Sequence, residues 1–339
     1  MRLPGLAAMR HVAGRARRLF APGALILVYH RVADVTLDPW SLAVSPARFA
    51  EQMEVLARVA RPMPLPGLVA ALREGRVPPR AVAVTFDDGY LDNLLHAWPA
   101  LERHEVPATV FIVTGQVGGD RAFWWDELAE LLLLPAALPP RLELRIRGRT
   151  VVRELGAAAG RAQAEPARRP WESAPGTRAA LHYEIWQELL PLPDAAQQET
   201  LAALRAWAAQ PQRPAAARPM RWPEVAQLAR GGLVELGAHT VTHLSLTDHA
   251  PEVQAAEIRE SKAELERRLG APVASFAYPY GRHDDRTAAL VEAAGIGCAC
   301  TVEARTIWRP GDCLRLPRYE ALDWDGDQFA ARLERWLRG

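Results

Sequence analysis

Two adjacent carboxylates are the first residues of this chain whose types and position suggest chemistry. Asp87 and Asp88 stand in the run TFDDGY, directly after the apolar stretch Ala81–Phe86. If that stretch is a strand, both carboxylates lie at its carboxyl end, where barrel enzymes hold their catalytic groups. Adjacent side chains can diverge at a turn, so one can bind a metal ion while the other faces a substrate. An Asp-Asp-Gly turn that only caps the next helix is the alternative interpretation.

A pair of histidines follows a second apolar stretch. His239 and His243, in the run HTVTH, come shortly after residues 233–236. This spacing predicts two imidazoles on one face of a helical turn, which could hold a zinc ion with one of the aspartates as third ligand. Two histidines that bond backbone groups in a loop are the alternative.

The run FAYPYG, residues 276–281, ends a third apolar stretch. A Pro-Tyr-Gly turn can direct a backbone N–H and an aromatic ring toward a reacting carbonyl group. If this run stood alone, an ordinary strand-to-loop turn would be the simpler interpretation.

Short apolar stretches recur along the chain and predict the strands that position these groups. Stretches with helical spacing, such as Pro251–Leu269, alternate with them. This alternation implies parallel pairing with right-handed crossovers. The expected fold is therefore α/β, a distorted (β/α)7-type barrel. Its strands are expected at residues 23–30, 81–86, 108–113, 233–236, 274–278, 297–302 and 314–316.

The alternation of strands and helices breaks in the middle of the chain. We expect a barrel over residues 23–339, interrupted by a mostly helical insertion over residues 121–221. A hairpin is expected inside the insertion, with strands at residues 142–146 and 150–155. Six of the eleven tryptophans lie in or bound this region. They could stack on sugar rings or pack in a core. A basic helix or tail is expected over residues 1–22.

The composition excludes several classes of protein. The 339 residues are 49% hydrophobic with a net charge of +1, so neither disorder nor a nucleic-acid partner is expected. Three cysteines form no disulfide framework, and Cys298 and Cys300 are expected to be buried core thiols.

No apolar run reaches the ~18 residues of a membrane span. Residues 1–20 hold five arginines without an uninterrupted apolar run, so we expect no signal peptide and a cytoplasmic protein. This segment could touch an anionic membrane surface weakly, plug one end of the domain, or be a free tail.

Taken together, TFDDGY, HTVTH and YPYG, in that order and each after a strand, resemble the polysaccharide deacetylase (NodB-homology) family, carbohydrate esterase family 4. The run LVYHRV, residues 27–32, also looks like the start of many bacterial members. The resemblance covers roughly residues 24–120 and 222–322 and leaves out the insertion.

The resemblance implies a set of roles for these residues. Asp88, His239 and His243 would bind one divalent metal ion, for which zinc is the first expectation and cobalt or another ion stays open. Asp87 would be the general base that deprotonates the metal-bound water. The Tyr280 backbone N–H would contact the substrate and complete the oxyanion hole. The implied reaction removes N-acetyl groups from an N-acetylated amino sugar in a polysaccharide or glycan precursor.

The sequence departs from the family pattern at two places. Phe276 stands where many members have an arginine that supports the base, so Asp87 must be oriented by another group. Arg318 stands where many members have a histidine as general acid, and an arginine cannot give up a proton near neutral pH. Arg318 is expected to bind an anionic substrate group or a neighbouring carboxylate.

The missing acid has two candidates. His30, at the end of the first expected strand, is the first candidate, and a structural histidine under the barrel mouth is the alternative interpretation. His283 is the weaker candidate.

A catalytically silent carbohydrate-binding barrel and an amidohydrolase for a small non-sugar amide remain the alternative functions. The intact aspartates and histidines argue against the silent barrel, while Arg318 keeps it open.

Overall fold

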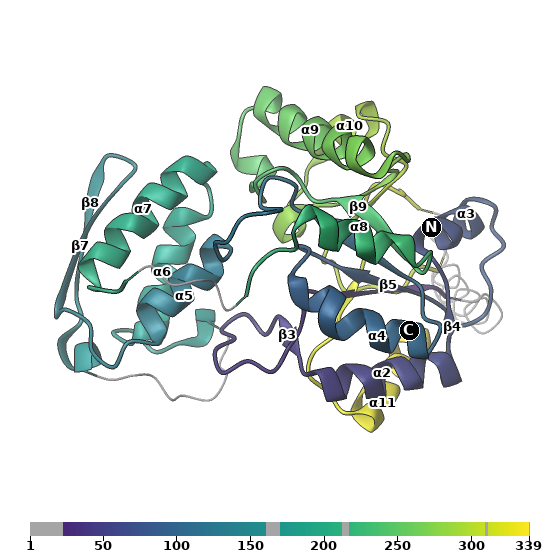
Figure 1. Ribbon diagram of the computed structural model, residues 1–339, viewed down its shortest axis with the longest axis horizontal. Helices are drawn as coiled ribbons and strands as arrows, with labels where there is room; N and C mark the ends of the chain where they lie inside the picture. Colours follow the sequence, from purple (N-terminus) through teal and green to yellow (C-terminus); the bar gives the residue numbers. More distant parts are fainter. Residues whose placement is uncertain (1–22, 161–169, 212–216, 309–310, 339) are drawn as a thin grey trace, which may run out of the picture.

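A parallel sheet positions the site (Figure 1). The computed structural model describes residues 23–160, 170–211, 217–308 and 311–338. Along the sheet the strand order is β11 (Cys298–Cys300), β10 (Ser275–Ala277), β9 (Val234–Ala238), β6 (Ala108–Ile112), β5 (Ala81–Phe86), β1 (Leu25–Tyr29) and β12 (Tyr319–Glu320). The short β4 (Arg61–Pro62) pairs with the start of β5.

The segment after β11 closes this sheet into a distorted barrel, as expected. Leu316 forms a parallel bridge with Cys300, and β12 then pairs with β1 through Tyr319 and Leu27. The expectation of a strand at residues 314–316 was wrong, because regular pairing begins only at Tyr319. Pro317 lies between the bridge and β12 and has no N–H to donate to a ladder.

The two faces of each strand have different surroundings. On β5, Ala83 packs inside the barrel, whereas Val84 packs outward in the core between the sheet and the helices. Both faces are buried, which explains the nearly continuous apolar runs of these strands. Side chains alternate with a period of two, so Asp87 continues the inward face of β5. The same alternation, counted from Ile26, brings His30 to the inward face of β1.

Helices cover the outside of the sheet (Figure 1). The first of them begins after Ser45 with Pro46 at its first position, as expected. The Ser45 hydroxyl does not cap this helix but donates to Asp323 Oδ1 over 2.8 Å. The helices are α2 (Pro46–Val59), α3 (Leu65–Arg73), α4 (Trp98–Arg103), α8 (Trp222–Arg230), α9 (Pro251–Leu269), α10 (Asp285–Ala293) and α11 (Gly326–Arg338).

The middle of the chain forms a separate lobe, on the left of Figure 1. The expected hairpin is confirmed, and its turn consists of Arg147 and Gly148 with φ of 52° and 76°. A two-residue turn with both φ positive matches the twist of paired strands. The elements of the lobe are α5 (Trp124–Leu133), β7 (Arg141–Ile146), β8 (Arg149–Glu154), α6 (Arg178–Leu189) and α7 (Asp194–Trp207).

The two ends of this lobe join the barrel at one place. The Gly118 N–H donates to the Met220 carbonyl over 3.2 Å, and the Met220 N–H donates to the Gly89 carbonyl over 3.0 Å. The hydrophobic core of the lobe includes Tyr90 and Val113 from the barrel. The lobe therefore begins and ends beside the TFDDGY turn.

Three further expectations concern the cysteines, membrane-spanning helices and residues 1–22. Cys298 and Cys300 are buried free thiols, as expected. Among the described residues, no helix is both long enough and apolar enough to cross a membrane. The basic helix or tail and its possible membrane contact concern residues 1–22, which lie outside the described residues.

Candidate active site

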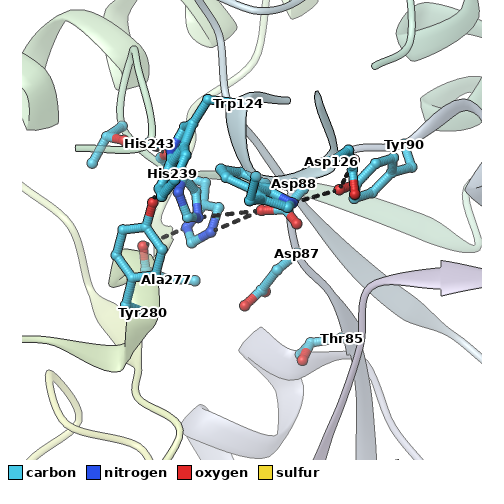
Figure 2. Close-up of polar contacts among 12 residues, drawn as sticks. Thr85, Asp87, Asp88, Tyr90, Trp124, Asp126, His239, His243, Ala277 and Tyr280 are labelled. Carbon is cyan, nitrogen blue, oxygen red and sulfur yellow. Dashed lines mark hydrogen bonds and ion pairs between the residues drawn. The ribbon is translucent and has the colours of Figure 1, made fainter. Parts of the chain in front are cut away.

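A sharp turn after β5 separates the two aspartates. Asp88 adopts φ of 72° and Gly89 φ of 76°, both in the left-handed region. The positive φ favours glycine at position 89, and a Cβ there would also lie 2.7 Å from the Ile112 Cδ1 atom. Asp87 continues the strand inward while Asp88 turns toward the two histidines (Figure 2).

Asp88 meets His239 and His243 in a buried cluster. Its Oδ1 atom lies 3.5 Å from His239 Nε2 and 3.3 Å from His243 Nε2. One ligand atom from each residue lies within 4.8 Å of the others, and all three side chains are buried. Figure 2 shows both imidazoles directed at this carboxylate. The sequence motifs therefore come together as expected.

The histidines are not on a helical turn, which corrects the expectation from their spacing. Residues 239–243 form a loop after β9, in which Thr240 and His243 have φ of 63° and 62°. Glu257 of α9 holds this loop by accepting from the N–H groups of Val241 and Thr242 over 2.8 and 2.9 Å. Glu257 was missed in the sequence because nothing distinguishes it from the other polar residues of α9.

The cluster fits a divalent metal ion. Asp88 Oδ1 and His243 Nδ1 are buried and have no hydrogen-bond partner among the described residues. His239 Nδ1 donates to the Ala277 carbonyl over 2.8 Å, which leaves the Nε2 lone pair for a ligand. Burial lowers the pKa of His243 to about 3, so this imidazole is neutral. One carboxylate and two imidazoles are a common three-residue set for a catalytic metal.

Asp87 has a different partner. Arg318 donates from Nη1 and Nη2 to the two oxygens of Asp87, each over 2.7 Å, and also to Thr85 Oγ1 over 3.1 Å. Burial raises the pKa of Asp87, but the charge of Arg318 outweighs it and holds this pKa below its ordinary value. Asp87 is therefore an ionised, fixed carboxylate beside the cluster.

The ion pair between Arg318 and Asp87 decides two expectations, one about the partner of Arg318 and one about the group that orients Asp87. Arg318 is fully buried, so the expected contact with an anionic substrate group is wrong, and the neighbouring carboxylate is its partner. Phe276 lies in the hydrophobic core and cannot support Asp87. Arg318 supplies that support from a distant part of the chain.

The YPYG turn lies against the same cluster. Tyr280 adopts φ of 59°, and its ring centroid lies 4.5 Å from that of His243. Its hydroxyl accepts from Trp124 Nε1 over 3.2 Å. Left-handed φ in a residue other than glycine is uncommon and concentrates at functional sites. Asp88, Thr240, His243 and Tyr280 all share it here.

Comparison with known proteins agrees with this geometry. The sequence profile of the polysaccharide deacetylase family matches residues 74–133 and 186–299, about half of the chain. The chain belongs to the polysaccharide deacetylase family. It is 31% identical over 110 residues to the poly-β-1,6-N-acetyl-D-glucosamine N-deacetylase of Staphylococcus aureus. That match spans 28% of this chain and only 37% of the staphylococcal protein.

Solved structures support the fold of this family member. The Streptococcus pyogenes deacetylase PplD has a TM-score of 0.58 at 17% identity, with 94% of this chain and 99% of that chain covered. IcaB from Ammonifex degensii has a TM-score of 0.58 at 20% identity, with 94% and 98% covered. At these identities the likeness establishes the barrel fold alone.

His30 lies at the same rim of the deacetylase barrel. The Asp87 N–H donates to the Tyr29 carbonyl over 3.0 Å, so His30 follows β1 beside Asp87. A positive charge on its half-buried ring would lower the pKa values of Asp87, Asp88 and His243. Within the described ranges, the ring has no carboxylate or carbonyl hydrogen-bond partner. Its role as acid stays a prediction.

His283 lies in a different environment. Its ring stacks on Tyr278 at 5.1 Å, and its Nδ1 atom lies 3.0 Å from the Gly281 carbonyl oxygen. Tyr278 belongs to the core between sheet and helices. His283 therefore stays the weaker candidate.

The first turn of α5 adds residues that the motifs did not reveal. The Trp125 ring lies 4.5 Å from that of His243, and its Nε1 donates to the Tyr90 hydroxyl over 2.9 Å. That hydroxyl donates to Asp126 Oδ2 over 2.8 Å, and burial raises the pKa of Asp126 to about 7 (Figure 2). We missed these residues because we treated the insertion as separate from the site.

Proposed function

We propose that this chain is a metal-dependent N-deacetylase that acts on N-acetylated amino sugars in a polysaccharide. One observation carries the proposal: a buried Asp88–His239–His243 cluster lies beside Asp87, which Arg318 holds ionised at the carboxyl end of β5. The name of the staphylococcal relative supports a β-1,6-linked N-acetylglucosamine polymer as the substrate class.

Asp88, His239 and His243 would hold the metal ion, and zinc suits this ligand set. When bound, such an ion polarises a carbonyl group and lowers the pKa of a water molecule towards ~7. The hydrogen bond from His239 to Ala277 keeps that imidazole oriented toward the cluster. Glu257 accepts a hydrogen bond from the loop that holds His243 and so keeps this imidazole in place.

Asp87 is the general base in this proposal and takes the proton from the attacking water. Arg318 fixes the direction of its carboxylate through two hydrogen bonds. The Tyr280 N–H donates to the oxyanion that develops on the acetamide, a contribution on the order of 3 kcal/mol. His30 donates a proton to the leaving amine, because Arg318 cannot.

Acetate release from a β-1,6-linked N-acetylglucosamine hexamer tests this function. We expect acetate with bound zinc, none after chelation, and recovery on adding zinc. Hexamer binding without acetate would instead identify a silent carbohydrate-binding barrel. Hydrolysis of small non-sugar amides, with no action on the hexamer, would identify an amidohydrolase.

A further inference from the structure

A continuous patch of aromatic side chains extends from the candidate site onto the inserted lobe. We call this set the aromatic patch and define it as Trp40, Trp171, Tyr183 and Trp186. Trp40 comes from the loop between β2 (Arg31–Val32) and β3 (Ala43–Val44), shortly after His30. Tyr183 and Trp186 come from α6, and Trp171 from the short 3-10 turn Pro170–Glu172.

The patch is joined to the site by ring contacts. Trp186 lies 6.1 Å from Tyr280 and 6.2 Å from Trp124, measured between ring centroids. Both of these residues border the metal-ligand cluster, since Tyr280 packs on His243 and accepts a hydrogen bond from Trp124. An aromatic surface therefore begins where the acetamide would react.

Away from the site the patch opens to solvent. Trp186 contacts Trp40 at 4.6 Å and stacks on Tyr183 at 6.1 Å, and Tyr183 contacts Trp171 at 6.4 Å. Trp171 is 52% exposed, whereas Trp124 is only 4% exposed. Because this exposed ring contacts other aromatic rings and is not an isolated surface residue, the set has the character of a binding surface.

The side chains of the patch suit a ligand with flat apolar faces. His182 lies beneath Trp40 at 5.7 Å, and burial lowers its pKa to about 4, so it is neutral. Tryptophan and tyrosine combine an apolar face with a polar edge, which suits rings that carry hydroxyl and amide groups. Sugar rings of a glycan have this character.

We propose that the aromatic patch binds the part of an N-acetylated glycan chain that lies beyond the residue being deacetylated. The inference rests on the proposed function, because it takes the substrate to be a glycan. A patch in this role should favour binding of long chains over short ones. Trp171 and Tyr183 lie in residues 134–185, which the family profile does not match, whereas Trp186 is the first residue of the second matched segment.

The test uses binding, so it does not depend on turnover. Chelator-treated full-length protein is titrated with β-1,6-linked N-acetylglucosamine dimer and hexamer in a calorimeter. For Trp171→Ala and Tyr183→Ala we expect hexamer affinity to fall roughly 3- to 10-fold, with a smaller change for the dimer. Trp207→Ala is the matched control, because Trp207 lies in the same lobe and donates to the Arg141 carbonyl over 2.7 Å.

The outcomes separate this inference from the proposed function. Unchanged hexamer affinity in both variants, or an equal loss for dimer and hexamer, would overturn the role of the patch. A loss as large in Trp207→Ala would overturn it too, since a general effect on the lobe would then explain the data. Selective loss of hexamer affinity in a protein that releases no acetate would support the patch and reject the deacetylase function.

Discussion

The barrel rim and the inserted lobe border the same site with side chains of opposite character. On the rim, Asp87 and Arg318 are charged, almost fully buried and joined by two hydrogen bonds. On the lobe, Trp186 and Trp171 are uncharged and increasingly exposed with distance from the cluster. The difference suggests that rigid strand ends hold the reacting groups, while an added lobe provides a surface for the rest of the substrate.

The two regions also differ in how much their polar contacts stabilise the fold. Removing one partner from a buried ion pair leaves an unpaired charge and costs roughly 3–5 kcal/mol. The lobe instead has exposed pairs such as Arg153–Glu184. Exposed pairs of this kind contribute roughly 0–1 kcal/mol. Substitutions at the rim should therefore have large effects and substitutions of lobe charges small ones.

The largest effect is expected for His243→Ala at the rim. The variant loses one of three metal ligands, so bound zinc should fall from about one ion per chain to almost none and activity should disappear. Elemental analysis after dialysis measures the metal, with His104→Ala as a control away from the cluster. Zinc retained in His243→Ala, or found on the cysteines, would contradict the ligand set.

Asp87→Asn should separate chemistry from metal binding. The amide cannot act as a base, so turnover should drop by about 10⁴-fold while zinc content stays near one per chain. Asp88→Asn should lower both quantities, because its carboxylate belongs to the cluster. An equal loss of metal in the two variants would show that our division of roles between these aspartates is wrong.

His30→Ala should reduce turnover by about 10²-fold, at the lower end of what a general acid contributes. Metal content and the unfolding temperature should not change, because the ring has no hydrogen bond to a described residue. Steady-state kinetics on the hexamer give the rate, with His283→Ala for comparison. If His283→Ala has the larger effect, the acid lies on the other side of the YPYG turn.

Arg318→Lys should move the pH profile more than the maximal rate. Lysine keeps the charge but loses the two-pronged contact, so the pKa of Asp87 should rise from its lowered value. Because the ionised carboxylate is the base, activity should begin to fall at a higher pH when the solution is acidified. The acidic limb of kcat/KM should move up by roughly one pH unit, while the rate near neutral pH, where Asp87 stays ionised in both proteins, should change less. An unchanged acidic limb would mean that Arg318 does not set this pKa.

The smallest effect is expected in the lobe. Arg153→Ala removes an exposed ion pair with Glu184, and we expect the free energy of unfolding to change by less than about 1 kcal/mol. Urea denaturation followed by fluorescence measures it, and deacetylation kinetics should stay at the wild-type level. A loss of several kcal/mol in the free energy of unfolding would contradict the difference drawn between the barrel rim and the inserted lobe.

Much of the site could be predicted from the sequence, because its groups follow strands directly. Asp87, Asp88, His239 and Tyr280 each come within a few residues of a buried strand. Parallel strands that alternate with helices bring their carboxyl ends to one rim, so these residues had to meet. The hairpin of the lobe was equally predictable, since a Gly-containing turn separates two short runs.

Only the tertiary structure revealed the partner of Asp87. Arg318 follows it by 231 residues, and the sequence left its partner open between an anionic substrate group and a neighbouring carboxylate. The tertiary structure also revealed Trp125, which reaches His243 because the inserted lobe begins beside the TFDDGY turn. Local motifs depend on neighbours in the chain, whereas these contacts depend on where the closed barrel brings distant segments together. The sequence by itself therefore determined which residues could hold a metal ion, and the packing of the closed barrel decided what orients the base beside it.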